Sequence, residues 1–282
     1  MNLIEIGALD DAIIGAVLAD RMVGLGGDDD FVGLAGNDSL FGRRGKDVLS
    51  SRANDDRLFG GADIDVLEGG NGNDVLEGGA GADILGGVGS DSLSFTRSAA
   101  AVNIDLTTAA ASGDDAAGDL YRGFKNLVGS GQNDTLTGNA LANRIEGGNG
   151  NDLTTGLAGA DNLFGEHGND TISGDDQNDR LSGDAGADTL SGGAAGGTLN
   201  GGGAGADVLV FGLLFGDEEI QNLAIAEDRL DLSLIPGINS LAQFQAAAIT
   251  FAANTLLSKA FGSTVAILGV TEGQCTTANF RF

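Results

Sequence analysis

Apolar residues recur at every ninth position along two long stretches of the chain, and an acidic residue stands two places before nearly all of them. The stretch GGNGNDVLEGGAGADILGG, Gly69 to Gly87, contains two such units in succession. In each unit, six residues of the form G-G-x-G-x-D predict a turn. The following x-U-x predicts a short strand whose apolar middle side chain points inward, because neighbouring side chains of a strand face opposite ways.

The apolar column is almost unbroken in both stretches. In the first it comprises Ile13, Met22, Phe31, Leu40, Leu49, Leu58, Leu67, Leu76, Leu85 and Leu93, and in the second Leu136, Ile145, Leu163, Ile172, Leu181, Leu190, Leu199 and Leu209, with Thr154 as the one polar member. One unit buries a single side chain, so the units must stack to make a core. Two units per coil place residues eighteen apart above one another, about 4.8 Å apart.

This pattern predicts an all-β fold, a right-handed parallel β-roll (β-solenoid) in two blocks with a small mixed C-terminal cap. We expect a first roll block at 1–93, spacer strands and a loop at 94–124, a second roll block at 125–211, and a cap at 212–282. In the spacer, VNIDL alternates like a strand and the Ala/Gly/Asp run after it reads as an exposed loop. In the cap, apolar spacing from Leu241 to Phe251 predicts a helix that begins at Asn239 or Ser240.

The stacking that buries the apolar column also places aspartates in rows. Like charges at strand spacing repel unless a cation lies between them. Oxygen ligands, the absence of a His or Cys column, and glycine turns that offer carbonyls favour calcium over magnesium, which needs stricter geometry. Eleven Asp–Asp pairs have a separation of eighteen, which predicts about eleven calcium ions. The predicted ligands are Asp11, Asp20, Asp29, Asp38, Asp47, Asp56, Asp65, Asp74, Asp83, Asp91, Asp134, Asp152, Asp161, Asp170, Asp179, Asp188 and Asp207.

The composition agrees with a cation-binding protein. The 282 residues carry a formal charge of −27 and include 50 glycines. Acidic disorder is the alternative, but 41% of the residues are hydrophobic and they recur in register. The acidity argues against nucleic acid as a partner. The lone Cys275 cannot form an internal disulfide, and the lone His167 lies in a turn, so we predict neither a thiol nor a histidine catalytic site.

Neither a membrane span nor an N-terminal export signal is predicted. The sequence holds no run of eighteen apolar residues. Its start, MNLIEIGALDDAIIG, has acids in place of the basic region of a secretory signal peptide.

The repeats resemble the RTX (repeats-in-toxin, hemolysin-type) family, whose calcium-binding nonapeptide is G-G-x-G-x-D-x-U-x. GGNGNDVLE, GGAGADILG and GEHGNDTIS match it, within a region from about Gly7 to Phe211. The resemblance implies calcium between successive turns, with the aspartates and loop carbonyls as ligands. It also implies export by a type I secretion machinery, an uncleaved signal in the C-terminal flank, and folding outside the cell.

Several turns depart from the pattern. Ser51, Asn54 and Asp63 replace glycines, and Asn and Asp tolerate the left-handed backbone that glycine supplies. Leu18 does not, so we expect an irregular first coil. Gly197 supplies no carboxylate and Asn143 only a weaker ligand, so the second block should lose sites.

The function favoured by these features is a secreted, non-enzymatic calcium-dependent scaffold of a surface layer, matrix or adhesive structure. It would self-associate into a lattice or filament, and the chain enters the repeats too early to leave room for a catalytic domain. Two alternatives stay open. One is the calcium-binding C-terminal module of a secreted enzyme, such as a serralysin-like protease, lipase or alginate epimerase. The other is an accessory protein that binds a cell-surface polysaccharide.

Overall fold

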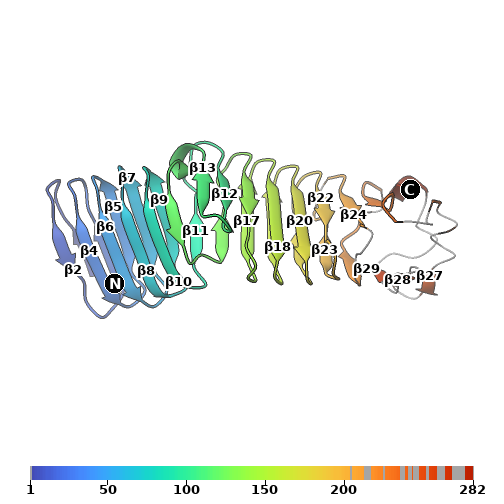
Figure 1. Cartoon of the computed structure of the whole chain (residues 1–282), viewed down its shortest axis with the longest axis horizontal. Coiled ribbons are helices and arrows are strands. Elements are labelled where there is room, and N and C mark those ends of the chain that lie inside the picture. Colours follow the sequence, from blue (N-terminus) through green and yellow to red (C-terminus); the bar gives the residue numbers. More distant parts are fainter. Residues whose placement is uncertain are drawn as a thin grey trace. The chain divides into compact units, whose positions relative to one another are not determined.

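The computed structural model describes residues 2–203, 205–212, 217–224, 226–235, 239–240, 243, 248–251, 254–258, 264–268 and 277–281. The chain divides into two compact units, Met1–Gly138 and Asn139–Phe282. Strands make up most of the regular structure in both (Figure 1). Among the described residues, no helix has the length and apolar character to cross a membrane.

The first unit is a parallel β-solenoid, in which odd-numbered and even-numbered strands form separate sheets. The odd-numbered strands follow the order β1 (Asn2–Glu5), β3 (Asp20–Val23), β5 (Ser39–Arg44), β7 (Arg57–Ala62), β9 (Val75–Ala80), β11 (Ser92–Ser94) and β15 (Asn126–Val128). The facing sheet follows the order β14 (Leu120–Arg122), β10 (Ile84–Gly89), β8 (Val66–Gly72), β6 (Val48–Ala53), β4 (Asp30–Ala35) and β2 (Ala12–Ile14). In Figure 1 these strands stack side by side along the blue and green part of the ribbon.

The register confirms two nine-residue units per coil. Leu40 of β5 pairs with Leu58 of β7, and Leu49 of β6 pairs with Leu67 of β8, each eighteen residues further along. These four leucines are fully buried. The apolar column predicted from the sequence is therefore the core of the roll, except that Ile13 in the first coil is only half-buried.

Many strands are longer than the sequence pattern predicts, while others, such as β2 and β22 (Thr189–Ser191), contain three residues as predicted. β5 contains six residues rather than three, because Arg43 and Arg44 pair with Gly61 and Ala62 after the apolar position. The glycine-rich half of each turn stacks on the same half of the next turn. Its backbone amides therefore join the ladder as well.

The spacer leaves the roll and then rejoins it. VNIDL forms β12 (Asn103–Asp105) as predicted, parallel to β16 (Thr135–Thr137) and antiparallel to β13 (Ala110–Ser112). A 3-10 turn, η1, covers Asp114–Ala116 in the largely exposed loop. β14 and β15 then stack on β10 and β11.

The second unit is again a parallel solenoid of two sheets, with a mixed sheet near the C-terminus. One sheet follows the order β17 (Arg144–Asn149), β19 (Asn162–His167), β21 (Arg180–Ser182), β23 (Thr198–Asn200), β25 (Glu218–Gln221), β29 (Thr264–Leu268), β28 (Asn254–Ser258) and β27 (Ala248–Phe251). The other follows the order β18 (Leu153–Ala158), β20 (Thr171–Asp176), β22 (Thr189–Ser191), β24 (Val208–Val210), β26 (Arg229–Asp231) and β30 (Phe280–Arg281), which follows the 3-10 turn η3 (Thr277–Asn279). β25 and β26 continue the parallel stack past residue 211.

The C-terminal helix prediction is correct only at its start. The backbone N–H of Gln243 donates to Oγ of Ser240 at 3.3 Å, and the N–H of Asn239 donates to Oε1 of Gln243 at 2.7 Å, which is a helix-capping arrangement. The prediction is wrong at its end, because Ala248–Phe251 forms β27, antiparallel to β28. Short apolar runs fit either structure, and here strand pairing prevails. Residues 241–242 and 244–247 lie outside the described part of the chain.

Candidate metal centre

The aspartates that end the turns are buried and hydrogen-bonded from one coil to the next. The backbone N–H of Asp38 donates to Oδ1 of Asp56 at 2.7 Å, and that of Asp47 donates to Oδ1 of Asp65 at 2.8 Å. The same bond joins Asp20 to Asp38, Asp29 to Asp47, Asp56 to Asp74, Asp65 to Asp83, Asp152 to Asp170, Asp161 to Asp179 and Asp170 to Asp188. One oxygen of each carboxylate therefore has a structural role.

The second oxygen, Oδ2, is buried without a hydrogen-bond partner in many of these residues. They are Asp29, Asp38, Asp47, Asp56, Asp65, Asp74, Asp83, Asp91, Asp161, Asp170, Asp179 and Asp188. Buried polar atoms are nearly always satisfied, so a regular series of exceptions requires an explanation. An ionised carboxylate only accepts, and a cation is a suitable partner for such an atom.

In most turns the Oδ2 atom faces a cradle beside a glycine, and Ser51 replaces this glycine in the turn that ends at Asp56. A Cβ on Gly60 would collide with Oδ2 of Asp65 and would lie 2.6 Å from the carbonyl oxygen of Gly78, one coil later. The same pair of oxygens surrounds Gly24, Gly156 and Gly183. Carboxylate and carbonyl oxygens are the donors that calcium takes. The residues present therefore fit the predicted ion.

Burial makes these carboxylates costly to ionise. Desolvation raises the pKa of Asp65 to about 8, with Asp83 and Asp47 adding like charge, while the backbone N–H of Asp47 opposes the shift. Desolvation likewise raises the pKa of Asp179 and of Asp188 to about 7. A bound cation would lower these pKa values, because it stabilises the charged form.

The turn backbone shows why the substituted turns still form. Asn54 and Asp63 have positive φ angles of 79° and 80°, at positions where other turns have glycine. Leu18 does not adopt a positive φ and is exposed. The first coil is irregular in this turn as expected, because glycines at the matching position of later turns have a positive φ, but β1 and β2 keep the eighteen-residue register with β3 and β4.

Four predicted ligands have different surroundings. Asp11 is only partly buried. Asp20 accepts from the Asn2 side chain at 2.7 Å and from the Ala16 N–H at 2.6 Å. Asp134 accepts from the N–H and the hydroxyl of Ser130. Asp207 accepts from the Asp188 N–H at 3.0 Å across nineteen residues, the inserted residue accounting for the difference.

Among the described residues, no three His, Cys, Asp or Glu side chains converge on one point, so carbonyls would complete each site.

Three acidic residues of the ladder escaped the sequence analysis. Asp119 accepts from the N–H of Asp83 at 2.9 Å, thirty-six residues away, and its Oδ2 is buried without a partner. Its signal was the Asp-x-apolar pattern of Asp119 to Tyr121, two coil lengths after Asp83. Asp228 accepts from the N–H of Asp207 at 3.1 Å, and Glu218 is buried at the start of β25.

The lone histidine has an ordinary place. His167 is exposed as predicted, but it is the last residue of β19 and not part of a turn, because β19 extends into the glycine-rich half of its unit. Cys275 lies outside the described residues.

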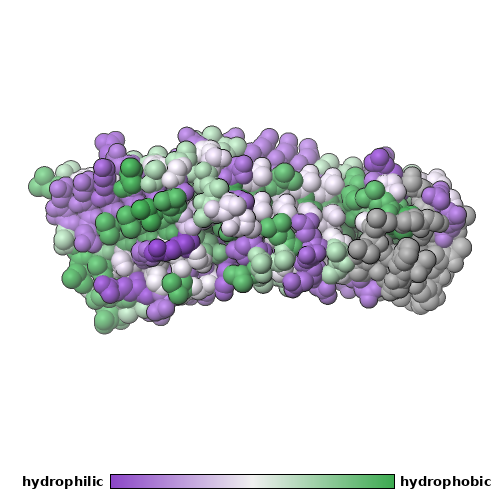
Figure 2. Space-filling model, viewed as in Figure 1, coloured by the Kyte–Doolittle hydropathy of each residue, from purple (hydrophilic) through white to green (hydrophobic). Residues whose placement is uncertain are grey.

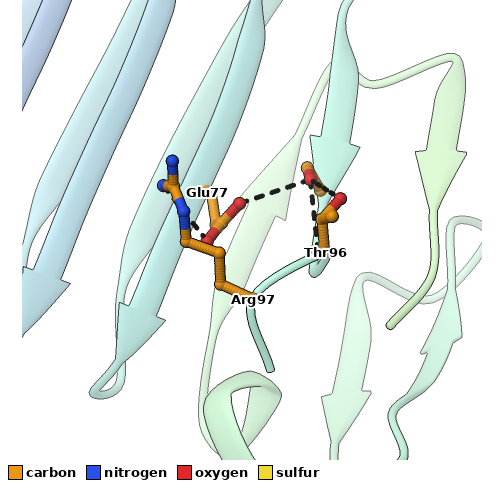
Figure 3. Close-up of polar contacts among 4 residues, drawn as sticks. Glu77, Thr96 and Arg97 are labelled. Carbon is orange, nitrogen blue, oxygen red and sulfur yellow. Dashed lines mark hydrogen bonds and ion pairs between the residues drawn. The ribbon is translucent and has the colours of Figure 1, made fainter. Parts of the chain in front are cut away.

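A second feature of the first unit is an arginine–phenylalanine stack, comprising Arg21, Phe41, Phe59 and Arg97. The two rings lie 4.9 Å apart at 11°, with the Arg21 guanidinium 4.8 Å from Phe41 and that of Arg97 3.9 Å from Phe59. Arg97 is held by the buried Glu77 at 3.5 Å (Figure 3). The half-buried Arg21 and the exposed Arg97 thereby hold their guanidiniums in place on a strongly acidic protein.

A parallel β-solenoid with a repeated carboxylate and carbonyl cradle is a calcium-binding β-roll. The RTX calcium-binding nonapeptide repeat matches residues 14–49, 23–58, 51–85, 59–93, 128–163, 155–190 and 164–199, which together cover more than half of the chain. The chain belongs to this RTX family, as the sequence resemblance predicted, and calcium is its ion. The number of ions stays a prediction.

Two solved structures are similar to the chain. One is the extracellular lipase LipA from Serratia marcescens, at 16% identity and a TM-score of 0.33, covering 100% of this chain and 40% of the lipase. The other is the AlgE6R3 subunit of the Azotobacter vinelandii mannuronan C5-epimerase, at 24% identity and a TM-score of 0.28, covering 54% of this chain and 78% of the subunit. The chain thus spans less than half the length of the lipase. A search of curated proteins finds no match.

Proposed function

We propose that the protein is a secreted, non-enzymatic scaffold that folds on calcium outside the cell and acts in a surface layer, matrix or adhesive structure. The observation that carries the calcium dependence is the series of buried, partnerless Oδ2 atoms. Burying ionised carboxylates without counter-charge opposes folding. Bound calcium would neutralise them, so the chain would stay expanded in a low-calcium cytoplasm and fold after export.

The proposed route out of the cell is type I secretion. RTX repeats are typical of extracellular proteins exported this way. The C-terminal flank, 212–282, would carry the signal.

The scaffold role is supported by surface features suited to contacts with a partner. The arginine–phenylalanine stack offers fixed positive charge on a chain whose net charge is −27, so the acidic surface of another copy complements it. The first coil also exposes Leu9, Ile14 and Val17. Figure 2 shows apolar residues, in green, gathered among polar ones on the visible face of the unit drawn in blue in Figure 1.

Sedimentation velocity, with calcium raised from chelator to about 10 mM, tests this function. The wild type should change from an expanded monomer to a compact one and then to larger regular species. The double variant R21A/R97A should still compact, at a somewhat higher calcium concentration because the buried Glu77 loses its ion pair, but should form fewer of the large species. Arg57→Ala removes an exposed arginine of β7 outside the stack and should behave as wild type. A compact monomer at every calcium concentration would contradict the scaffold role while leaving calcium binding intact.

The exposed apolar first coil also favours a second candidate, the calcium-binding module of a longer secreted enzyme. Such a surface fits packing against a preceding catalytic domain. The mass of the intact protein from its cells decides between the two, since a mass well above 28.1 kDa would support the module. Binding of an acidic polysaccharide, measured with and without chelator, tests the third candidate.

A further inference from the structure

The turn that ends at Gly197 has no aspartate of its own, and the sequence pattern predicts that its calcium site is lost. In neighbouring turns of the second unit the arrangement is regular. A Cβ on Gly174 would collide with Oδ2 of Asp179, and one on Gly183 would collide with Oδ2 of Asp188. In each case the first glycine of the turn touches the carboxylate five residues later. Gly192 is the first glycine of the turn that ends at Gly197. Because Gly197 has no side chain, this turn has no carboxylate to place beside Gly192.

Another carboxylate occupies this place. A Cβ on Gly192 would collide with Oε1 of Glu218 and would lie 3.1 Å from its Oε2. Thr198 pairs with Glu219, so Glu218 lies one coil beyond Gly197 in the stack. In the regular turns, the aspartate one coil on does not approach the first glycine this closely. Glutamate is one methylene longer than aspartate, and the missing side chain at Gly197 leaves room for it to extend back by one coil.

The carboxylate of Glu218 has the signature of the regular ligands. The residue is 2% exposed, and neither oxygen accepts a hydrogen bond of regular geometry, although the backbone N–H of Gly197 lies close enough to the carboxylate to lower its pKa. Asp179, eighteen residues before Gly197, also has a buried Oδ2 without a partner. Without a cation, the Gly197 N–H would be the only favourable neighbour given for this buried carboxylate among the described residues, and desolvation outweighs it, raising the pKa of Glu218 to about 7.

We propose that Glu218 supplies the carboxylate that Gly197 lacks, so that the turn at residues 192–197 binds a calcium ion. The proposal rests on the family's calcium binding and not on the scaffold role. Failure of the scaffold would leave the number of bound ions unchanged, so the two outcomes are distinguishable.

Native mass spectrometry of the calcium-loaded chain tests this assignment by counting bound ions. Glu218→Gln keeps the shape of the side chain and removes its charge, and should bind one calcium ion fewer than the wild type. Glu218→Asp keeps the charge but shortens the reach, and should lose the same ion. Glu219→Gln is the matched control, because Glu219 is the next residue and is partly exposed on β25. It should retain the full number.

Hydrogen exchange provides the local readout. Adding calcium should protect peptides covering 192–221 in the wild type, and this protection should be lost in E218Q while 144–176 stay protected. If E218Q lost protection throughout the second unit, the ion count of E218D would decide, with a full count contradicting the proposal. An unchanged ion count in E218Q, or unchanged protection at 192–221, would overturn it.

Discussion

The substitution Asp65→Asn should change stability in opposite directions with and without calcium. The amide keeps an oxygen that can accept from the Asp47 N–H, but it removes the charge of the buried, partnerless Oδ2. With site affinity of about 10⁻⁴ M and calcium at about 1 mM, losing one ion costs ~1.4 kcal/mol. In chelator the same change removes a carboxylate that must take up a proton to be buried, since its pKa is raised to about 8, and should stabilise the fold by about 1–2 kcal/mol.

Thermal unfolding followed by circular dichroism measures both effects at pH 7.5. In about 1 mM calcium the Tm of D65N should fall by about 3–5 °C. In chelator, with sucrose added to favour the folded state, D65N should melt above the wild type. Asp30→Asn, which neutralises an exposed carboxylate of β4, should change Tm little in either condition. A lower Tm for D65N in both conditions would refute the reasoning, because Asp65 would then act through its hydrogen bond alone.

Three further predictions follow from the same geometry. In chelator with sucrose, the roll should be more stable at pH 5 than at pH 8. Asp65 has a folded pKa of about 8 and an ordinary pKa of 3.8, so the folded state binds the extra proton and loses stability as pH rises between these values. A flat pH profile of urea unfolding under these conditions would contradict this. Leu58→Ala should destabilise the calcium-loaded roll by about 2–5 kcal/mol in urea unfolding, because Leu58 is fully buried. Val48 is 44% exposed, so Val48→Ala should lower the free energy of unfolding by about 0.5 kcal/mol or less. Gly60→Ala should weaken calcium binding in isothermal titration, since its Cβ would enter the cradle beside Asp65, and Gly7→Ala, with open space around it, should bind as wild type.

The period of nine was sufficient to predict the core and the stacking. A buried column of one apolar residue per unit can be satisfied only by parallel coils, so the pairing of Leu40 with Leu58 follows from spacing alone. The aspartate rows followed from the same argument. The extra length of strands such as β5 could not be predicted from the sequence. Pairing in the glycine-rich half of a turn depends on backbone contacts, which the alternation of side chains does not indicate.

The acidic residues that the sequence analysis missed share one physical cause. Asp119 follows Asp83 by 36 residues and Glu218 follows Gly197 by 21, so neither lies eighteen residues after the previous position of the ladder. A loop of any length can return the chain to the next coil, and the fixed period is lost there while the stack continues. The C-terminal strand β27 was missed because four apolar residues in a short run fit helix and strand equally.

The most direct test of the central claim is a titration of the metal-free chain with calcium, followed by far-UV circular dichroism, with magnesium at equal concentrations in parallel. The account predicts an expanded chain in chelator that gains β-structure cooperatively with calcium at about 0.1–1 mM and does not gain it with magnesium. A chain that is equally folded in chelator, or that folds as well with magnesium, would contradict the assignment of the aspartate rows as calcium sites.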